Sequence, residues 1–426
     1  MNPFHGKLLA GSLLLASASF ALGATPIVGT WEGAATVRGQ QVPVRLEITG
    51  TPSNLKASLL NGPERAAASA VTFKDGALLI SFNYFARSLE AKLDGEQLSG
   101  TFGLVSPGTP AHPSAPRVPV ALHPALATPS PQAGPDIKGD WEIAVKSNKG
   151  ESAWQLRVAP TKQPDVIHAV IQRIDGDTGS LYGSWDGHQY IVSHFTAAGA
   201  ALYSILPQQD GTVLLSNLIA PEAQKAQARD LVGRRPADAR KEQLTAPTES
   251  TQQTSVKDPN AAFAFSFPDL AGKQVSNTDP RFNGKVVIVA IGGSWCPNCH
   301  DEAPFLESLY KKFHAKGLEI VNLSFEEEDQ LKDPTRLRAF IKRYGLTYPV
   351  LVAGTPDQLN EKVPQGDHLN CWPTSFILGR DGRVKEVHAG FAGPANPQAH
   401  EELQHEVTAT LEKLLAEPAP TQSASR

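Results

Sequence analysis

The sequence predicts two antiparallel β domains, each a barrel or a sandwich, followed by an α/β domain. Residues 24–105 and 136–235 carry short strand patterns with a period of two, separated by turn residues. Residues 261–416 instead alternate buried-strand patterns with amphipathic-helix patterns. The proline-rich segment 106–135 and the polar segment 236–260 lack both periods and are interpreted as linkers. The 426 residues also exceed what one hydrophobic core usually organises.

The N-terminus predicts export. A short apolar run, residues 8–15, is followed by the small residues Ala21 and Gly23, a pattern typical of a signal peptide over residues 1–23 that is cleaved before Ala24. The protein is therefore expected in the periplasm or the extracellular envelope. The alternative is that the segment stays uncleaved and anchors the protein, although the run is shorter than a spanning helix requires.

Composition narrows the class of partner. A net charge of −4 is too small and of the wrong sign for nucleic acid or anionic lipid as the main partner. Hydrophobic residues at 41% and charged residues at 19% are ordinary for a globular protein. Residues 417–426 are expected to form a disordered tail.

The two β domains resemble each other weakly. Each opens with Gly-x-Trp-Glu, at residues 29–32 and 139–142, and continues into alternating strand residues, 42–48 and 154–158. Asp-Gly pairs that suit tight hairpin turns lie at residues 75–76, 94–95, 186–187 and 210–211. The openings resemble those of lipocalin-like barrels over these few residues. A ligand cavity in either domain is one interpretation, and a filled core that positions the third domain or docks a partner is the favoured one.

The α/β domain follows a regular order of elements. Residues 285–291 form a continuous apolar run, as expected of a strand buried on both faces. Further strands are predicted over residues 318–324, 348–352, 374–378 and 384–388, and helices over residues 302–316, 334–344 and 397–416.

The chain contains three cysteines, and two of them form Cys296-Pro297-Asn298-Cys299 between a predicted strand and a predicted helix. A Cys-x-x-Cys pair closes too small a loop to be a useful staple, which favours redox or metal chemistry. Unpaired N–H groups and the dipole at a helix start favour a thiolate, so Cys296 is the expected nucleophile. Cys299, one turn along and expected to be less exposed, would resolve the mixed disulfide. Trp295 would shape the apolar surface around the sulfur.

The residues 295–299, with Glu302, Pro304 and residues 373–376 before a strand, resemble the TlpA-like family of envelope thioredoxins. The resemblance covers about residues 261–416. It implies a thioredoxin fold and a thiol-disulfide oxidoreductase that reduces disulfides of envelope proteins, without a cofactor or a metal. The implied partners are protein disulfide substrates and a membrane thiol-disulfide electron donor.

The resemblance also assigns site residues. It makes Cys296 the attacking thiol and Cys299 the resolving thiol of a redox-active disulfide. It makes Glu302 the buried acid that handles the proton of Cys299, where the alternative is a solvated helix residue. It makes Pro373 a cis-proline that faces the disulfide.

Two residues depart from the family pattern. Trp372 precedes the proline where the family has a small or β-branched residue, so Trp372 and Trp295 are expected to give a bulky substrate surface. Cys371 either acts as a third redox thiol or, as the more general tendency of lone buried cysteines favours, packs inertly.

Four rival functions use parts of the same sequence. Cys296 to His300 also fits the Cys-x-x-Cys-His signature of covalent haem attachment, but Met1 is the only methionine, so a second histidine ligand would be needed. Zinc would need four donors, and one cysteine pair with a neighbouring histidine supplies too few. Peroxide-reducing relatives carry a proline-threonine context before the cysteine, which residues 291–295 lack. Finally, the β domains could be a binding module that carries a vestigial third domain.

Overall fold

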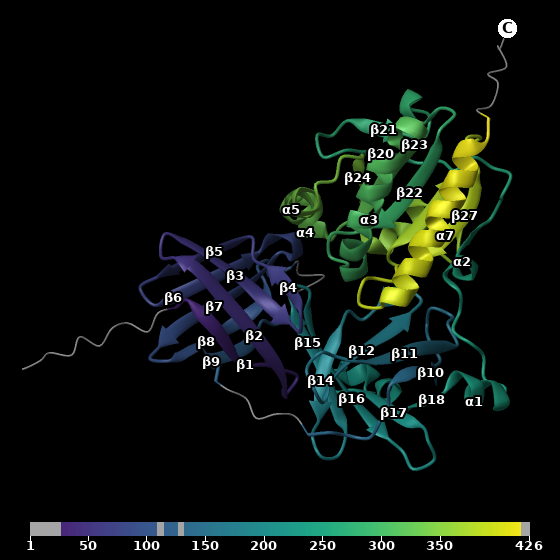
Figure 1. Cartoon of the computed structure of the whole chain (residues 1–426). Helices are drawn as coiled ribbons and strands as arrows, with labels where there is room; N and C mark the ends of the chain where they lie inside the picture. Colours follow the sequence, from purple (N-terminus) through teal and green to yellow (C-terminus); the bar gives the residue numbers. More distant parts are fainter. Residues whose placement is uncertain (1–26, 109–114, 127–131, 419–426) are drawn as a thin grey trace, which may run out of the picture.

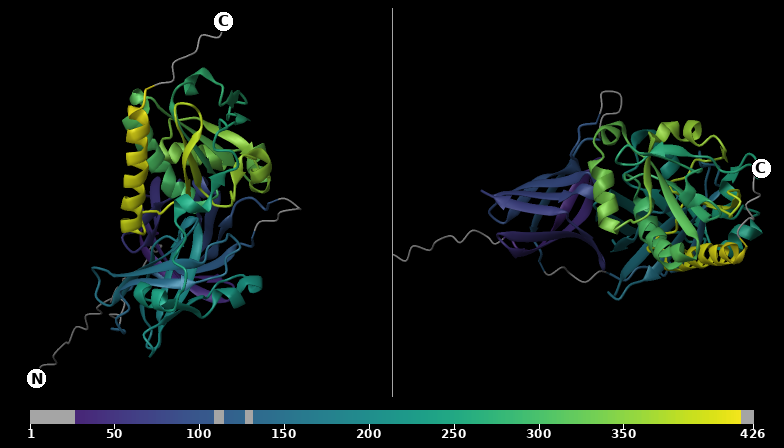
Figure 2. Two further views of the ribbon diagram at one scale, coloured as in Figure 1. Left: turned by 90° about the vertical axis from the view of Figure 1, so that its right-hand side faces the viewer. Right: turned by 90° about the horizontal axis from the view of Figure 1, so that it is seen from above.

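The computed structural model describes residues 27–108, 115–126 and 132–418. The predicted signal peptide and most of the predicted tail lie outside these residues. The predicted fold class is confirmed, since two β domains precede a thioredoxin-like α/β domain. The α/β domain rests on the second β domain, and the first β domain lies beside both (Figures 1 and 2). No helix in the described ranges is long and apolar enough to cross a membrane.

The first β domain is a nine-stranded antiparallel sheet that curves into a half-barrel (Figure 1). Its strand order is β4-β3-β2-β1-β9-β8-β7-β6-β5. The strands are β1 (Gly29–Val37), β2 (Gln40–Thr51), β3 (Asn54–Asn61), β4 (Glu64–Ala67), β5 (Ala70–Lys74), β6 (Ala77–Phe82), β7 (Arg87–Asp94), β8 (Gln97–Leu104) and β9 (Val118–Pro124), with the 3-10 turn η1 (Asn83–Phe85). Alternate residues of β2 are buried, which confirms the period of two read from the sequence.

Strand β9 corrects the prediction that residues 106–135 are a linker. It lies between β1 and β8 in the middle of the sheet, although Pro119 removes one backbone donor. Val120 and Leu122 are 4% and 2% exposed. The burial of these two side chains in the core of the half-barrel outweighs the loss of the hydrogen bond at Pro119. The apolar residues at positions 118, 120 and 122 alternate as in a strand, but the many prolines around them hid this pattern.

The second β domain is a closed barrel. Strands β11, β10, β18, β17, β16, β15, β14 and β12 follow in that order, and β11 pairs with β12 to close the ring. The bounds are β10 (Gly139–Ala144), β11 (Ala153–Pro160), β12 (Val166–Arg173), β13 (Gly176–Asp177), β14 (Leu181–Trp185), β15 (Tyr190–Thr196), β16 (Gly199–Pro207), β17 (Val213–Asn217) and β18 (Leu231–Arg234), with the turns η2 (Glu222–Gln224) and η3 (Ala226–Ala228). Apolar side chains fill its interior, among them Trp141, Ile143 and Leu156.

The two Gly-x-Trp-Glu openings make the same contact. The indole N–H of Trp31 donates to the carbonyl of Ile27 at 2.9 Å, and that of Trp141 donates to Ile137 at 2.9 Å. Each tryptophan is nearly fully buried, so its polar N–H needs an internal partner. The weak repeat in the sequence therefore corresponds to one local structure used twice.

The α/β domain contains a five-stranded mixed sheet of order β24-β23-β22-β26-β27. Its elements are β22 (Val286–Gly292), α3 (Pro297–Phe313), η5 (His314–Lys316), β23 (Leu318–Phe325), α4 (Glu328–Lys332), α5 (Thr335–Tyr344), β24 (Val350–Gly354), η6 (Pro356–Gln358), α6 (Leu359–Lys362), β25 (Gly366–Asp367), β26 (Thr374–Leu378), β27 (Val384–Ala389) and α7 (Pro397–Ala416). A hairpin of β20 (Ser266–Pro268) and β21 (Gln274–Ser276), then η4 (Pro280–Phe282), precede β22.

Both faces of the central strand β22 are covered, as its apolar run predicts. Val286, Ile288 and Ala290 face a core shared with α3, α5 and α7. The alternate residues Val287 and Val289 face a second core built with the N-terminal segment of the domain. This packing fixes the end of β22, where the cysteine motif begins.

The segment 236–260 is also more ordered than the predicted linker. It contains α1 (Pro236–Lys241), α2 (Ser250–Gln253) and β19 (Ser255–Val256), which pairs with β25. The Gln253 side chain donates to the carbonyl of Lys149 at 2.6 Å, and the Thr254 hydroxyl donates to that of His368 at 3.1 Å. This segment has no hydrophobic period, and polar side chains attach it to the rest of the chain by hydrogen bonds. Hydrophobic periodicity in the sequence does not reveal such contacts.

Candidate active site

The cysteine motif lies at the junction of β22 and α3. Cys296 is the N-cap residue of α3, and Pro297 occupies the first helical position, where its missing N–H costs nothing. The backbone N–H of Cys299 donates to the Sγ of Cys296 at 3.3 Å. One donor of the open helix end is thus directed at the Cys296 sulfur, which is the arrangement that the sequence predicts.

Neither thiol is accessible, which corrects the expectation that Cys296 is the more exposed of the two. Cys296 is 3% exposed and Cys299 5%. All three cysteines of the chain lie in the described residues, and all are unpaired. Asp175 of the closed barrel contacts Asn298 and Trp372, which lie on either side of Cys296, and nothing in the local sequence indicated these contacts.

The cis-proline loop lies across from the motif. The Trp372–Pro373 peptide bond is cis, and the Cys296 thiol lies 3.6 Å from the carbonyl oxygen of Trp372. The Trp295 and Trp372 rings meet edge to face, with centroids 5.3 Å apart. The Trp295 indole N–H donates to the carbonyl of Phe325 at 2.9 Å. The two tryptophans therefore form one apolar wall beside the sulfur.

Glu302 is buried beneath the pair, not solvated. It is 5% exposed and accepts a hydrogen bond from the Ser375 hydroxyl at 2.8 Å. Burial raises its pKa to about 7, opposed by the Ser375 bond. Burial, followed by the contact with Cys296 and the charge of Glu302, raises the pKa of the Cys299 thiol well above its usual range. Near neutral pH, Glu302 can therefore take up or release a proton beside Cys299.

A buried ionic network behind the motif was missed by the sequence reading. Both the backbone N–H and the hydroxyl of Ser294 donate to the Glu326 carboxylate at 2.7 Å. The Arg336 guanidinium donates to Glu326 at 2.8 Å and to the Ser294 hydroxyl at 2.8 Å. The network holds the turn before Cys296 in place. The available signal was Glu326, a charge that directly follows a strand predicted to be central in the sheet.

Comparisons with known proteins give matches to the C-terminal part of the chain. Residues 259–387 match the AhpC/TSA family. Over 126 residues the chain is 33% identical to the thiol-disulfide oxidoreductase ResA of Bacillus anthracis. The matched region covers 30% of this chain and 66%, just under two thirds, of that relative. Over 144 residues it is 29% identical to the thioredoxin-like protein YneN of Bacillus subtilis, 34% of this chain and 78% of the relative.

Among solved structures, a thiol:disulfide interchange protein of the thioredoxin family from Chlorobium tepidum TLS is 24% identical, with a TM-score of 0.30. The match covers 38% of this chain and 100% of that one. The C-terminal domain is similar to thioredoxin-like thiol-disulfide oxidoreductases, and we call it the TlpA-like domain.

In the TlpA-like domain, His300 is committed to protein contacts. Its Nε2–H donates to the Ser294 carbonyl at 2.9 Å, and its Nδ1 lies 3.0 Å from the hydroxyl of Tyr344. Its ring stacks on Phe85 of the half-barrel with centroids 4.0 Å apart, and burial lowers its pKa to about 3. Covalent haem attachment needs this histidine as an iron ligand, so the geometry does not favour that alternative.

Cys371 is buried in an apolar contact. It packs with Ile174 and Ala389, and burial raises the pKa of its thiol to about 12. A thiol so rarely ionised is a poor nucleophile. This environment favours the inert interpretation over a third redox thiol.

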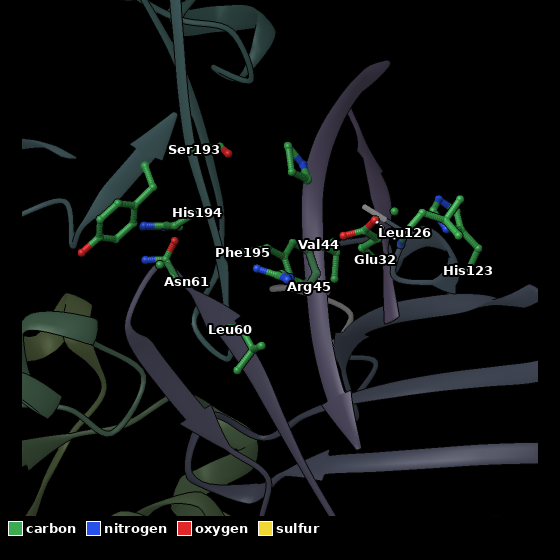
Figure 3. A pocket seen from close by; sticks show the side chains of 14 residues that line it. Glu32, Val44, Arg45, Leu60, Asn61, His123, Leu126, Ser193, His194 and Phe195 are labelled. Carbon is green, nitrogen blue, oxygen red and sulfur yellow. Dashed lines mark hydrogen bonds between the residues drawn. The ribbon is translucent and has the colours of Figure 1, made fainter. Parts of the chain in front are cut away.

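A cavity of about 590 Å³ lies between the two β domains, not inside either (Figure 3). Arg45, Leu60 and Asn61 of the half-barrel line it, together with His194 and Phe195 of the closed barrel. One interpretation of the sequence was a ligand cavity within a β domain, but this cavity lies at the junction of the two β domains.

Three carboxylates, one from each domain, line a second cavity of about 460 Å³ beside the first turn of α3. They are Glu64, Asp177 and Asp301. Burial raises the pKa of Asp177 to about 6, and the Asp177 carboxylate accepts a hydrogen bond from the Gly393 N–H at 2.7 Å. Burial, and then the charges of Asp177 and Glu64, raise the pKa of Asp301 to about 8.

We expect Asp301→Asn to stabilise the folded chain by about 1–3 kcal/mol at pH 8.5, and less at pH 5. The folded state holds a proton on Asp301 that the unfolded chain loses near its ordinary pKa of 3.8. Stability is therefore lost as pH rises from this value through about 8. Thermal unfolding of both proteins at pH 5.0 and 8.5 measures the effect. Parallel pH dependences would contradict it.

Proposed function

We propose that this protein is an exported thiol-disulfide oxidoreductase that reduces disulfides of envelope proteins through Cys296 and Cys299. The observation that carries the proposal is the geometry around the Cys296 sulfur. A helix N–H points at it, a second thiol lies one turn along the helix, and a buried acid lies beneath that thiol. Trp372 and Trp295, with Pro373, form the surface that receives the substrate.

In the first step, the Cys296 thiolate attacks one sulfur of a substrate disulfide. An S–S bond forms between Cys296 and the substrate, the substrate S–S bond breaks, and the other substrate sulfur leaves as a thiolate. The N–H of Cys299 and the helix end stabilise negative charge at the Cys296 sulfur. Cys296 is therefore the thiol that attacks first.

In the second step, Cys299 attacks the Sγ of Cys296. Its thiol must first lose a proton, and burial makes this loss unfavourable. The Glu302 carboxylate accepts the proton, because its raised pKa of about 7 brings its basicity nearer to that of the thiol. The second substrate thiolate leaves, and the protein retains a Cys296–Cys299 disulfide.

A complete cycle needs two partners. Protein disulfides supply the electron acceptor, and a membrane thiol-disulfide protein is the proposed donor that reduces the Cys296–Cys299 disulfide again. The predicted signal peptide over residues 1–23 supports a location in the envelope. The relatives named as thiol-disulfide oxidoreductases support the activity.

Redox titration of the purified mature protein tests the proposal. In buffers of defined thiol and disulfide ratio, Cys296 and Cys299 are expected to oxidise together as a two-electron pair, with a potential below about −200 mV. A potential near about −120 mV, where strong oxidants of this fold lie, would reverse the direction. A pair that does not equilibrate with the buffer would remove the activity. A visible spectrum with a Soret band would return the haem alternative.

A further inference from the structure

The two-residue turn between β12 and β13 leaves the closed barrel and lies on the TlpA-like domain. We name this turn, residues 174 and 175, together with Gly176, the cover hairpin. Arg173 pairs with Gly176, so Ile174 and Asp175 form its tip. Ile174 is 6% exposed and packs with Cys371 beside the cis-proline, apart from the apolar core of its own barrel. The tip is therefore shaped for the neighbouring domain.

Polar contacts tie the tip to three segments around the Cys296 sulfur. The carbonyl of Asp175 accepts from the side-chain amide of Asn298, inside the cysteine motif, at 3.0 Å. It also accepts from the backbone N–H of Phe391, after β27, at 3.1 Å. The Asp175 carboxylate lies 3.4 Å from the backbone N–H of Trp372, whose carbonyl faces Cys296. The hairpin thus forms hydrogen bonds with polar groups of the residues beside the reactive sulfur.

Glycines on both sides permit this close approach. A Cβ at Gly176 would lie 2.2 Å from the carbonyl oxygen of Phe391 and 2.7 Å from the Asn298 amide. A Cβ at Gly390, on the opposing backbone, would lie 2.0 Å from the carbonyl oxygen of Ile174. Any side chain at either position would hold the two domains apart.

Substrate access conflicts with this arrangement. Thiol-disulfide exchange needs the two reacting sulfurs about 3–3.5 Å apart. With the hairpin docked against Asn298 and Trp372, Cys296 is 3% exposed, which is too little for a protein disulfide to reach its sulfur. The polar contacts that the hairpin makes across the interface are hydrogen bonds, which suits an interface that opens.

We infer that the cover hairpin is an intramolecular cover of the dithiol site, and that a protein disulfide reaches Cys296 only after this hairpin withdraws. The inference rests on the proposed function for its purpose. It gives the closed barrel a role, which is to control access to the thiols. It also identifies the docking surface for substrate as the one that the hairpin occupies.

Alkylation of the reduced full chain by iodoacetamide at pH 7 tests the inference, with the rate at Cys296 followed by peptide mass spectrometry. Gly176→Ala wedges the interface, and Ile174→Asp places a charge in its apolar contact. Gly187→Ala is the matched control, because Gly187 lies in the same barrel at a φ of +102° with no atom within 4 Å of an added Cβ. Gly176 has a φ of +127°, so both alanines carry backbone strain.

Both interface variants are expected to raise the alkylation rate of Cys296 by roughly tenfold or more, because the rate follows the open population. The control is expected to react like the parent. Parent-like rates in both Gly176→Ala and Ile174→Asp would overturn the inference. Faster alkylation without any disulfide reduction would leave the cover standing and remove the proposed function. If the parent reduces disulfides but neither variant is alkylated faster, the proposed function stands and the cover is ruled out.

Discussion

Cys296→Ser is expected to lower the rate of disulfide reduction by at least about 10³-fold, because a serine hydroxyl does not attack sulfur at neutral pH. The Cys296 sulfur accepts the hydrogen bond that the backbone N–H of Cys299 donates at the helix start. The measurement is the reduction of insulin disulfides driven by dithiothreitol, with the uncatalysed rate subtracted. Circular dichroism shows whether the variant is folded.

Cys299→Ser is expected to stop the reaction one step later. Cys296 still forms the mixed disulfide, but no second thiol releases it, so a covalent complex with the substrate accumulates and is visible on a non-reducing gel. Cys371→Ala is the matched control, since Cys371 is also a buried thiol but lies outside the Cys-x-x-Cys pair. It is expected to release the substrate and to accumulate no covalent complex. Complexes formed by Cys296→Ser, or full activity in every variant, would contradict the assignment.

Glu302→Gln is expected to lower the rate of disulfide reduction by about 10²-fold at pH 7, within the range of general acid–base catalysis. Glutamine keeps the size of the side chain and can still accept from the Ser375 hydroxyl. It cannot accept the proton that Cys299 must lose. Single-turnover decay of the mixed disulfide isolates this step from the attack by Cys296.

The pH profile separates proton transfer from a structural effect. The pKa of Glu302 is about 7, so the parent rate is expected to rise with pH through this value as the carboxylate ionises. In the variant this rise is absent, and the deficit shrinks at higher pH as hydroxide deprotonates Cys299. Glu307→Gln is the control, because Glu307 is buried on the same helix but binds Thr347 instead. A Glu307 variant with the same altered profile would contradict the role of Glu302.

Local patterns carried the prediction of the α/β domain. The apolar run before the motif became β22, and the predicted helix over residues 397–416 became α7. Signals of this kind arise within a few residues of one another, through helical or strand periodicity and cap residues. Where local composition misled, as at Pro119 in β9, burial of the alternate residues in a distant core decided the structure.

The sequence by itself determined the three-domain class, the position of Cys296 and Cys299 at a helix start, and Glu302 one turn further along. Only the tertiary structure decided that the two thiols are covered, that His300 packs on Phe85, and that carboxylates from three domains meet. The contact between Asn298 and Asp175 joins residues 123 positions apart. No period or spacing encodes such a contact, because it depends on which finished surfaces meet after each domain has folded.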